Sequence, residues 1–201
     1  IKTYKMKKLL FLLMFPVLCF GQYTLIPDQN FEQALIDLGY DSILDGQVIT
    51  NNINFIDSLN VSNNNISDLT GIEDFTALKY LFCQNNPIGS LNLTQNNLLV
   101  ELDLFLNQIT YLDLTQNILL KNIYFEGNPL VGLDLSNNVN LIGLWGNGSD
   151  ISCLNIKNGN NLYINNFYLS FTPNLTCIQV DDPIWATNNL TNITQGTFAL
   201  D

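Results

Sequence analysis

The chain has 201 residues with seven lysines, no arginine, no histidine and 18 acidic residues, which gives a net charge of −11. So acidic a chain repels phosphate backbones, and we expect no nucleic-acid binding. Without histidine, Ser-His-Asp or Cys-His catalysis and histidine-ligated metal sites are excluded, and without arginine there is no bidentate clamp for carboxylates or phosphates.

The N-terminal residues have the pattern of a secretory signal peptide. Met6 is followed by two lysines and an apolar run over residues 9–20, with small residues at Cys19 and Gly21 before the expected cleavage point. The run is too short to span a membrane, and no other segment has the length and apolarity of a transmembrane helix. We therefore expect residues 1–21 to be signal peptide and upstream residues, and the protein to be secreted or at the cell surface. A buried N-terminal helix and a lipid anchor on Cys19 are the alternatives.

Residues 22–55 are expected to form an N-terminal cap. Apolar side chains recur on one face of a short helix from Asp28 to Leu38, with Asp28 as its N-cap and Gly39 as its stop. Residues 41–47 (DSILDGQ) faintly resemble a calcium-binding loop. The spacing does not fit an EF-hand and no Glu closes the loop, so a turn is expected there.

A period of about 21 residues begins at Ile56. Segments that fit L-x-x-L-x-L-x-x-N-x-L, give or take one position, start at Ile56, Leu78, Leu99, Leu120 and Leu141. A second copy of the pattern lies inside each unit and starts at Ile88, Ile109, Leu130 and Ile151. Each period therefore holds two nested half-repeats of 10 and 11 residues.

The spacing of these half-repeats predicts a β-rich solenoid. An L-x-L alternation is a short strand with one side chain inward, so each coil should carry two strands and stacked coils should form two short parallel β-sheets. Asparagine, with 31 residues in the chain, recurs in the turns, where its amide can bond inward backbone groups of successive coils. Ser149 and Gly159 interrupt this series, so the last coil is expected to be looser. The two series are Asn86, Asn107 and Asn128, and Asn96, Asn117 and Asn138.

Three cysteines remain after the signal peptide, namely Cys83, Cys153 and Cys177. An odd number leaves one thiol unpaired or paired outside the chain. Cys83 occupies a core-facing repeat position and is expected to be a small buried hydrophobe. The spacings match no zinc site.

The repeat over residues 56–162 resembles the leucine-rich repeat, in the nested 21-residue type of secreted bacterial proteins. Residues 114–138 (LTQNILLKNIYFEGNPLVGLDLSNN) keep both half-repeats in register. Residues 26–50 (IPDQNFEQALIDLGYDSILDGQVIT) and 172–182 (TPNLTCIQVDD) resemble the cap and C-terminal flank of secreted flavobacterial proteins. In that family a C-terminal sorting domain of the type IX secretion pathway commonly follows. The resemblance implies that residues 163–201 are a truncated C-terminal cap.

The same resemblance bears on the cysteines. In that family the chain usually continues with a further cysteine beyond the point that corresponds to Asp201. It therefore implies that Cys177 lacks its partner within this sequence.

Outward positions of the first half-repeats predict a ligand-binding face. Aromatic side chains on a rigid sheet suit recognition of proteins and sugars, so Phe82, Tyr124 and Trp145 are expected as anchors. Asp103 and Glu126 would set the polarity. The alternative is that these aromatics stack across strands and protect the sheet. The expected face consists of Tyr80, Phe82, Asp103, Phe105, Tyr124, Glu126 and Trp145.

Outward positions of the second half-repeats are mostly small and polar. Asp113 and Asp134 lie one period apart there, at a separation that suits the carboxylate pair of a retaining glycosidase. The repeat consensus produces such a pair by itself, so no catalytic residue, cofactor or metal site is assigned. A polysaccharide-active enzyme, a spacer, and a stalk stabilised by calcium along Asn92, Asp113, Asp134 and Asn155 are the alternatives. The expected function is non-catalytic binding of a protein or polysaccharide, with the oligomeric state open.

Overall fold

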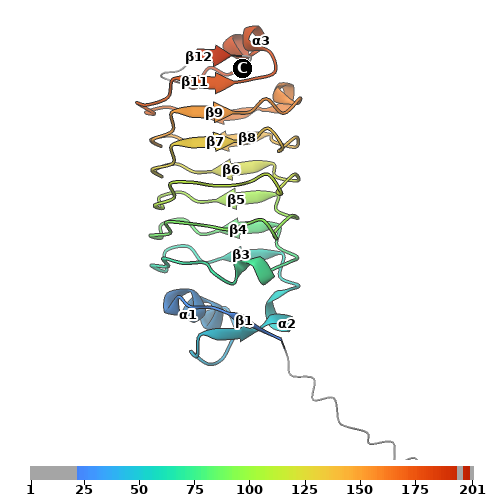
Figure 1. The fold of residues 1–201 in the computed structure, drawn as a ribbon, viewed down its shortest axis with the longest axis vertical. Helices are drawn as coiled ribbons and strands as arrows, with labels where there is room; N and C mark the ends of the chain where they lie inside the picture. Colours follow the sequence, from blue (N-terminus) through green and yellow to red (C-terminus); the bar gives the residue numbers. More distant parts are fainter. Residues whose placement is uncertain (1–21, 194–196, 200–201) are drawn as a thin grey trace, which may run out of the picture.

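The protein is a stack of coils with a helical segment at each end. The computed structural model describes residues 22–193 and 197–199. Helix α1 (Gln29–Asp37) lies at one end of the stack and helix α3 (Pro183–Asn189) at the other (Figure 1). The expected signal peptide, residues 1–21, lies outside the described residues. Within them, no helix has both the length and the apolar character needed to cross a membrane.

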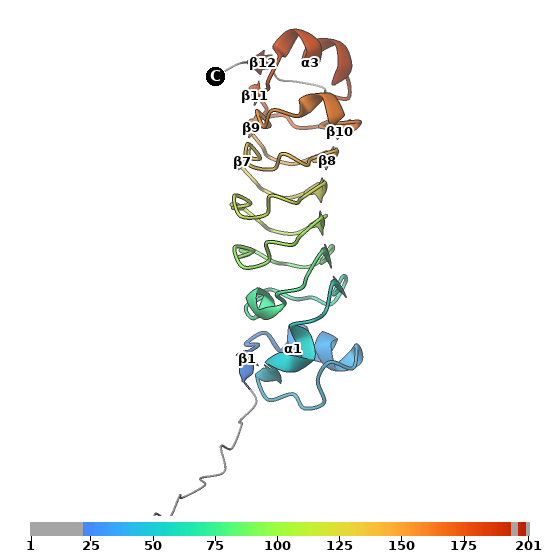
Figure 2. The ribbon, with the colours of Figure 1, turned by 90° about the vertical axis from the view of Figure 1, so that its right-hand side faces the viewer.

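Two parallel sheets lie on opposite sides of the stack (Figure 2), as the sequence predicts. The first sheet has the order β10-β8-β6-β5-β4-β3 and the second β12-β11-β9-β7. The first comprises β3 (Ser58–Asn60), β4 (Tyr80–Phe82), β5 (Glu101–Asp103), β6 (Asn122–Tyr124), β8 (Gly143–Trp145) and β10 (Asn166–Tyr168). The second comprises β7 (Gly132–Asp134), β9 (Cys153–Asn155), β11 (Cys177–Gln179) and β12 (Thr197–Ala199).

The core lies between the two sheets and is built from columns of aliphatic side chains. The middle residue of each strand in the first sheet points inward and pairs in register with its neighbour, as Leu81 does with Leu102. Burial of these columns supplies the main driving force for stacking the coils. The inward column of the first sheet is Leu59, Leu81, Leu102, Ile123, Leu144 and Phe167, and all six are buried.

The second sheet is shorter than the sequence pattern predicts. Residues 90–93 and 111–114 have the L-x-L spacing, yet the first regular strand on this side is β7. A shallow groove of about 560 Å³ lies over this side and is lined by residues 110–115 and 131–134 together with Cys153, Asn155 and Gln179. Residues 111–114 form no backbone ladder with β7, which adjacent strands of a sheet need. The prediction of two strands in every coil is therefore wrong for the first coils.

Buried asparagines link successive coils, as predicted. Asn117 Nδ2 donates to the carbonyls of Leu93 and Asn96, at 3.1 and 2.9 Å. The series does not stop at Gly159, because Asn158 Nδ2 donates to the Asn138 carbonyl at 3.0 Å. The expected break in this series is therefore wrong.

The other asparagine series does end where predicted. Ser149 replaces Asn, and its hydroxyl donates only to the Gly146 carbonyl of its own coil, at 2.7 Å. Thr172 one coil later does the same with the Leu169 carbonyl, at 3.1 Å. A hydroxyl is shorter than an amide and has one proton, so it satisfies the local turn without reaching the neighbouring coil.

The N-terminal cap is held by two carboxylates. Asp28 is the N-cap of α1, and its Oδ1 accepts from the Asn30 and Phe31 amides while its Oδ2 accepts from Ser67 in the first coil. The buried Glu32 Oε1 accepts from three successive amides, those of Asp45, Gly46 and Gln47. The cap also contains α2 (Thr50–Ile53) and an antiparallel pair, β1 (Tyr23–Leu25) and β2 (Gln47–Ile49).

Both sheets continue beyond residue 162, where the sequence period is lost. Strand β10 pairs in parallel with β8, and β11 with β9. Short 3-10 helices lie at Ile72–Asp74 and Asn161–Tyr163.

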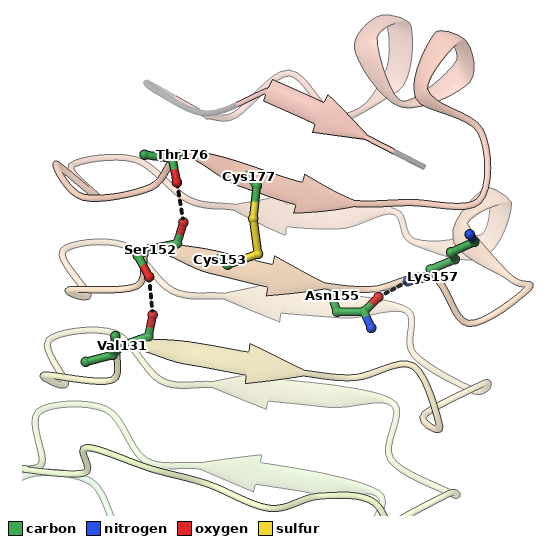
Figure 3. Close-up of a disulfide and its surroundings, with 7 residues drawn as sticks. All are labelled: Val131, Ser152, Cys153, Asn155, Lys157, Thr176 and Cys177. Carbon is green, nitrogen blue, oxygen red and sulfur yellow. Dashed lines mark hydrogen bonds between the residues drawn. A yellow bond between two sulfur atoms is a disulfide. The ribbon is translucent and has the colours of Figure 1, made fainter. Parts of the chain in front are cut away.

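A disulfide joins the last two coils. Cys153 and Cys177 face each other in β9 and β11, with Cα atoms 4.9 Å apart, and their sulfurs are bonded (Figure 3). The expectation that Cys177 lacks its partner within this sequence is therefore wrong. The pair is separated by 24 residues instead of 21, so the regular period does not align it. Cys83 is free and buried, as predicted.

Candidate functional site

The first sheet gathers the predicted aromatic residues into one outward column. Strand pairing sets Phe82 opposite Asp103, Asp103 opposite Tyr124, and Tyr124 opposite Trp145. The column continues to Tyr168 in β10. Sequence reasoning missed Tyr168 because it follows Trp145 by 23 residues instead of 21. The spacing of Asn166-Phe167-Tyr168-Leu169, polar-apolar-aromatic-apolar, was the available signal.

Three rings of this column are stacked. The centroids of Tyr124 and Trp145 lie 4.2 Å apart with ring planes 12° from parallel. Trp145 and Tyr168 continue the stack at 6.1 Å and 17°. Each ring thus covers a face of its neighbour, and an aromatic pair of this kind contributes about 0.5–1.5 kcal/mol beyond its buried area.

A glycine makes room for the central ring. A Cβ at Gly143 would overlap the six-membered ring of Trp145 and approach Asn122 Oδ1. The indole therefore lies against the backbone of its own strand. Although both positions face outward, Gly143 is buried and Trp145 is only partly exposed. The sequence shows Gly143 at an outward position but gives no sign of this function.

Carboxylates lie beside the stack. Asp103 on β5 lies opposite Tyr124, and Glu101 precedes Asp103 by two residues on the same strand. Glu126 follows Tyr124 by two residues. Burial raises the pKa of the Tyr124 phenol, and the charges of Glu101, Asp103 and Glu126 raise it further. The side of the stack nearest Tyr124 is therefore acidic.

Asp103 is half-buried in the middle of the column. Burial raises the pKa of its carboxyl, although the Phe105 amide donates to Oδ1 at 3.0 Å and opposes that effect. Directly below, the Cys83 thiol donates to the Asp103 carbonyl at 3.4 Å. Burial, together with the charge of Asp103, raises the pKa of this thiol, so Cys83 stays a protonated core residue.

The remaining predicted face residues border the column. Tyr80 and Phe105 are 37% and 36% exposed and have no stacking partner among the described residues. Glu126 Oε1 accepts from Asn147 Nδ2 at 2.9 Å. Asn147 in turn accepts from the Ser170 amide at 2.8 Å, so it ties the border of the face to the next coil. The seven predicted residues therefore lie on one side of the solenoid, but only Tyr124 and Trp145 belong to the stack.

The acidic pair on the second side serves the turns. Asp113 Oδ1 accepts from both the amide and the hydroxyl of Thr115, at 2.9 and 2.7 Å, and Asp134 Oδ1 accepts from the Ser136 amide at 2.9 Å. These bonds lower the pKa of Asp113. A glycosidase acid needs a raised pKa, so the arrangement fits side chains that close a turn and does not fit a catalytic pair. Asn60, Asn92 and Asn155 close equivalent turns.

Metal ligands do not gather in the described part of the chain. No group of three or more Cys, Asp or Glu side chains in it could hold a metal ion together.

The groove beside Asp113 and Asp134 is also lined by Tyr111, Gly132, Cys153 and Gln179.

Comparison with known proteins identifies the fold. Residues 56–95 match the family model described as Leucine Rich repeats (2 copies). The functional domain of InlJ from Listeria monocytogenes superposes with a TM-score of 0.67, at 24% sequence identity over 90% of this chain and 45% of that chain. The chain has the fold of a leucine-rich repeat solenoid. An internalin, InlF of Listeria monocytogenes strain 4b F2365, superposes with a TM-score of 0.56, at 19% identity over 88% of this chain and 57% of that chain.

The chain spans about half the length of these two solved structures. No curated protein matches the chain in sequence. The InlJ domain includes a cysteine ladder. In the present solenoid, Cys153 and Cys177 lie one above the other in adjacent strands and form a bridge.

Proposed function

We propose that this leucine-rich repeat solenoid is a secreted or cell-surface module that binds a protein or polysaccharide through the outward face of its first sheet, without catalysis. The observation that carries the proposal is the stack of Tyr124, Trp145 and Tyr168 on a sheet face that no other element of the described residues covers (Figure 2). Large aromatic side chains on a rigid surface supply most of the binding energy in protein interfaces.

The rigidity of the face supports the same proposal. Strands β4, β5, β6 and β8 pair in continuous register, and inward Leu and Ile side chains hold them from below. A preformed surface loses little conformational entropy on binding, so more of the free energy of its contacts appears as affinity. Solenoids commonly present extended surfaces of this kind.

The non-catalytic part of the proposal rests on the carboxylates. Asp113 and Asp134 each use an oxygen to close a turn, and the pKa of Asp113 is lowered instead of raised. Lining residues of the groove beside them include no lysine. Neither a general acid nor a cation that could stabilise a developing negative charge is therefore positioned there.

Export, domain limits and family type complete the proposal. Residues 1–21 would be the signal peptide and upstream residues, 22–55 the N-terminal cap, 56–162 the repeats and 163–201 the C-terminal cap. The motifs at residues 26–50, 114–138 and 172–182 support assignment of the chain to the nested 21-residue type of flavobacterial secreted proteins. Mass spectrometry of the protein exported by a bacterial host tests the first part, because cleavage should leave Gln22 as the N-terminal residue.

Binding is tested with the purified chain on arrays of bacterial and host surface proteins and of polysaccharides. The matched variant carries Phe82→Ala, Tyr124→Ala and Trp145→Ala, with far-UV circular dichroism to confirm that it is folded. Its control is Tyr111→Ala, which removes an aromatic ring that is 72% exposed on the other side of the solenoid. Loss of binding in the triple variant alone supports the proposal.

Equal binding by wild type and triple variant would move the site to the caps or to the second side. Absence of any saturable partner on either array would favour a structural spacer. If the wild type released a sugar product and the double variant Asp113→Asn with Asp134→Asn did not, the protein would be an enzyme instead.

A further inference from the structure

We propose that the partner of the first sheet is a protein segment rich in lysine or arginine, held with its cationic ends at Glu101, Asp103 and Glu126 and its side-chain stems along the rings of Tyr124 and Trp145. The inference rests on the proposed function and names the partner class for the same face. Four observations carry it.

The first observation is the charge of the face. Glu101 and Asp103 on β5 and Glu126 just after β6 surround Tyr124. None of the six strands of the first sheet contains a lysine. Lys79 and Lys121 precede β4 and β6, and Lys79 is already paired with Asp57 at 3.4 Å. The face therefore has carboxylates in excess, and a basic partner complements it.

The charge of the whole chain acts in the same direction. Four of the seven lysines lie in the first eight residues, outside the described part, whereas every acidic residue follows residue 27. Residues 22–201 hold three lysines and all 18 acidic residues, which gives a net charge of −15, against −11 for the whole chain. The field of these residues attracts basic partners from solution and repels acidic polysaccharides and acidic proteins.

The second observation concerns the rings. A sugar binds an aromatic side chain by lying against an open ring face. Tyr124 and Trp145 cover each other at 4.2 Å, and Tyr168 lies on the far side of Trp145. Trp145 therefore has a ring against each of its faces, and its edge remains for a ligand, as an apolar strip that suits the aliphatic stems of lysine and arginine. This geometry disfavours a sugar ring stacked on Trp145.

The third observation is the partial burial of Asp103. Its carboxylate is half-buried, has no cationic partner among the described residues, and accepts one hydrogen bond, from the Phe105 amide. A guanidinium or ammonium group supplied by the partner would provide the missing counter-charge at a partly desolvated position. Ion pairs at such positions contribute more than fully exposed pairs.

The fourth observation is that free acceptor oxygens remain on the face. Asp103 uses Oδ1 for the Phe105 amide, and Glu126 uses Oε1 for Asn147. Each carboxylate has a second oxygen, and Glu101 lies two residues before Asp103 on β5. Arginine can bind two oxygens at once, so alternate residues of an extended segment could reach successive carboxylates along the sheet.

The test uses the full chain and a fluorescent peptide that alternates arginine with leucine. The control peptide has citrulline, which is the neutral isostere, at each arginine. Affinity is measured by fluorescence anisotropy at low and at physiological salt. The test variant carries Glu101→Gln, Asp103→Asn and Glu126→Gln, which keep shape and hydrogen bonding.

The matched control variant loses the same number of charges elsewhere, through Asp113→Asn, Asp134→Asn and Asp150→Asn. These residues close turns or lie in an exposed loop, and Asn closes the same turns elsewhere in the chain. Circular dichroism checks that both variants fold. The comparison therefore separates charge on the face from net charge of the protein.

We expect the arginine peptide to bind wild type and the control variant with similar affinity, and the face variant about tenfold more weakly. The citrulline peptide should bind all three weakly, and salt should reduce the difference. Equal affinity of the arginine peptide for the face and control variants would overturn the inference.

Failure of the inference is distinguishable from failure of the proposed function. A partner from the arrays that is lost in the Phe82, Tyr124 and Trp145 alanine variant, but retained when the three carboxylates are neutralised, leaves the binding face in place and refutes a basic partner. Retention of that partner in both variants refutes both.

Discussion

The indole of Trp145 lies over Gly143, two residues earlier on the same strand, in the space that a side chain at position 143 would occupy. This relationship keeps the indole in the stack between Tyr124 and Tyr168. The shape of the proposed binding face thus depends on the absence of a side chain beside it.

Gly143→Ala should displace the Trp145 ring and break the stack. The added Cβ would overlap the ring and Asn122 Oδ1, so we expect a loss of about 1–3 kcal/mol of unfolding free energy and a change in near-UV circular dichroism. Gly132→Ala on β7 is the matched control, because its nearest atom would be the Cys153 carbonyl oxygen at 3.7 Å. Similar urea midpoints for the two variants would contradict this prediction.

Alanine in place of the buried asparagines should weaken the stack of coils, and by different amounts in the two series. Asn107 donates to the carbonyls of Cys83 and Leu104 and accepts from the Ile88 amide. Asn117 makes two donor bonds only, and its Oδ1 has no partner among the described residues.

We therefore expect Asn107→Ala to cost about 2–4 kcal/mol and Asn117→Ala about 1–3 kcal/mol, because each buried group left without a partner costs about 1–3 kcal/mol. Urea unfolding of both variants measures the difference. A larger loss in Asn117→Ala would show that its oxygen does have a partner, such as a buried water.

Acid should weaken the N-terminal cap through Asp28. Burial by itself would raise the pKa of this carboxyl, but hydrogen bonds from Ser67, Phe31 and Asp68 outweigh it and bring the pKa below the ordinary 3.8. Its stabilising effect is therefore complete above pH 3.8 and is lost as the pH falls through the lower pKa of the folded state.

Asp28→Asn keeps the helix cap but replaces the oxygen that accepts from Ser67, so it should cost about 1–2 kcal/mol at neutral pH. The cost should shrink in strong acid, where wild type is protonated too. Urea unfolding at neutral and acidic pH measures this, and a cost that does not depend on pH would contradict it.

Asp103 should behave in the opposite way. Burial raises the pKa of its carboxyl, so the charged form opposes folding, and this cost grows as the pH rises through the folded-state pKa. Asp103→Asn removes the charge and still accepts from the Phe105 amide. We expect it to stabilise the protein at neutral pH and to have little effect in acid. Destabilisation at neutral pH would show that a cation of the chain already neutralises Asp103.

The disulfide should stabilise the last coils. Cys153 and Cys177 close a loop of 24 residues, which corresponds to about 3 kcal/mol. We expect a reducing agent, or serine at both positions, to lower the melting temperature and to increase amide exchange in β11 before β4. Cys83→Ala with the disulfide intact is the control, and melting that is insensitive to reductant would contradict the prediction.

Sequence periodicity by itself determined the solenoid, its two sheets and the inward columns. A column such as Leu81 and Leu102 requires only an L-x-L spacing and a constant period, and both are local properties of the chain. The helix begun by Asp28 and the burial of Cys83 follow from equally local patterns. The outward column of Phe82, Asp103, Tyr124 and Trp145 follows from the same constant period, because each of these residues occupies the same position in its repeat.

Only the tertiary structure decided what happens where spacing departs from the period or where one coil acts on the next. Tyr168 joins the stack and Cys177 meets Cys153 across intervals of 23 and 24 residues, because extra residues in the turns are absorbed without a change of register. The second sheet begins only at β7, although residues 90–93 and 111–114 have the same L-x-L spacing. Strand pairing depends on the distance between backbones, and that distance is set by packing of the whole stack instead of by the residues of one repeat.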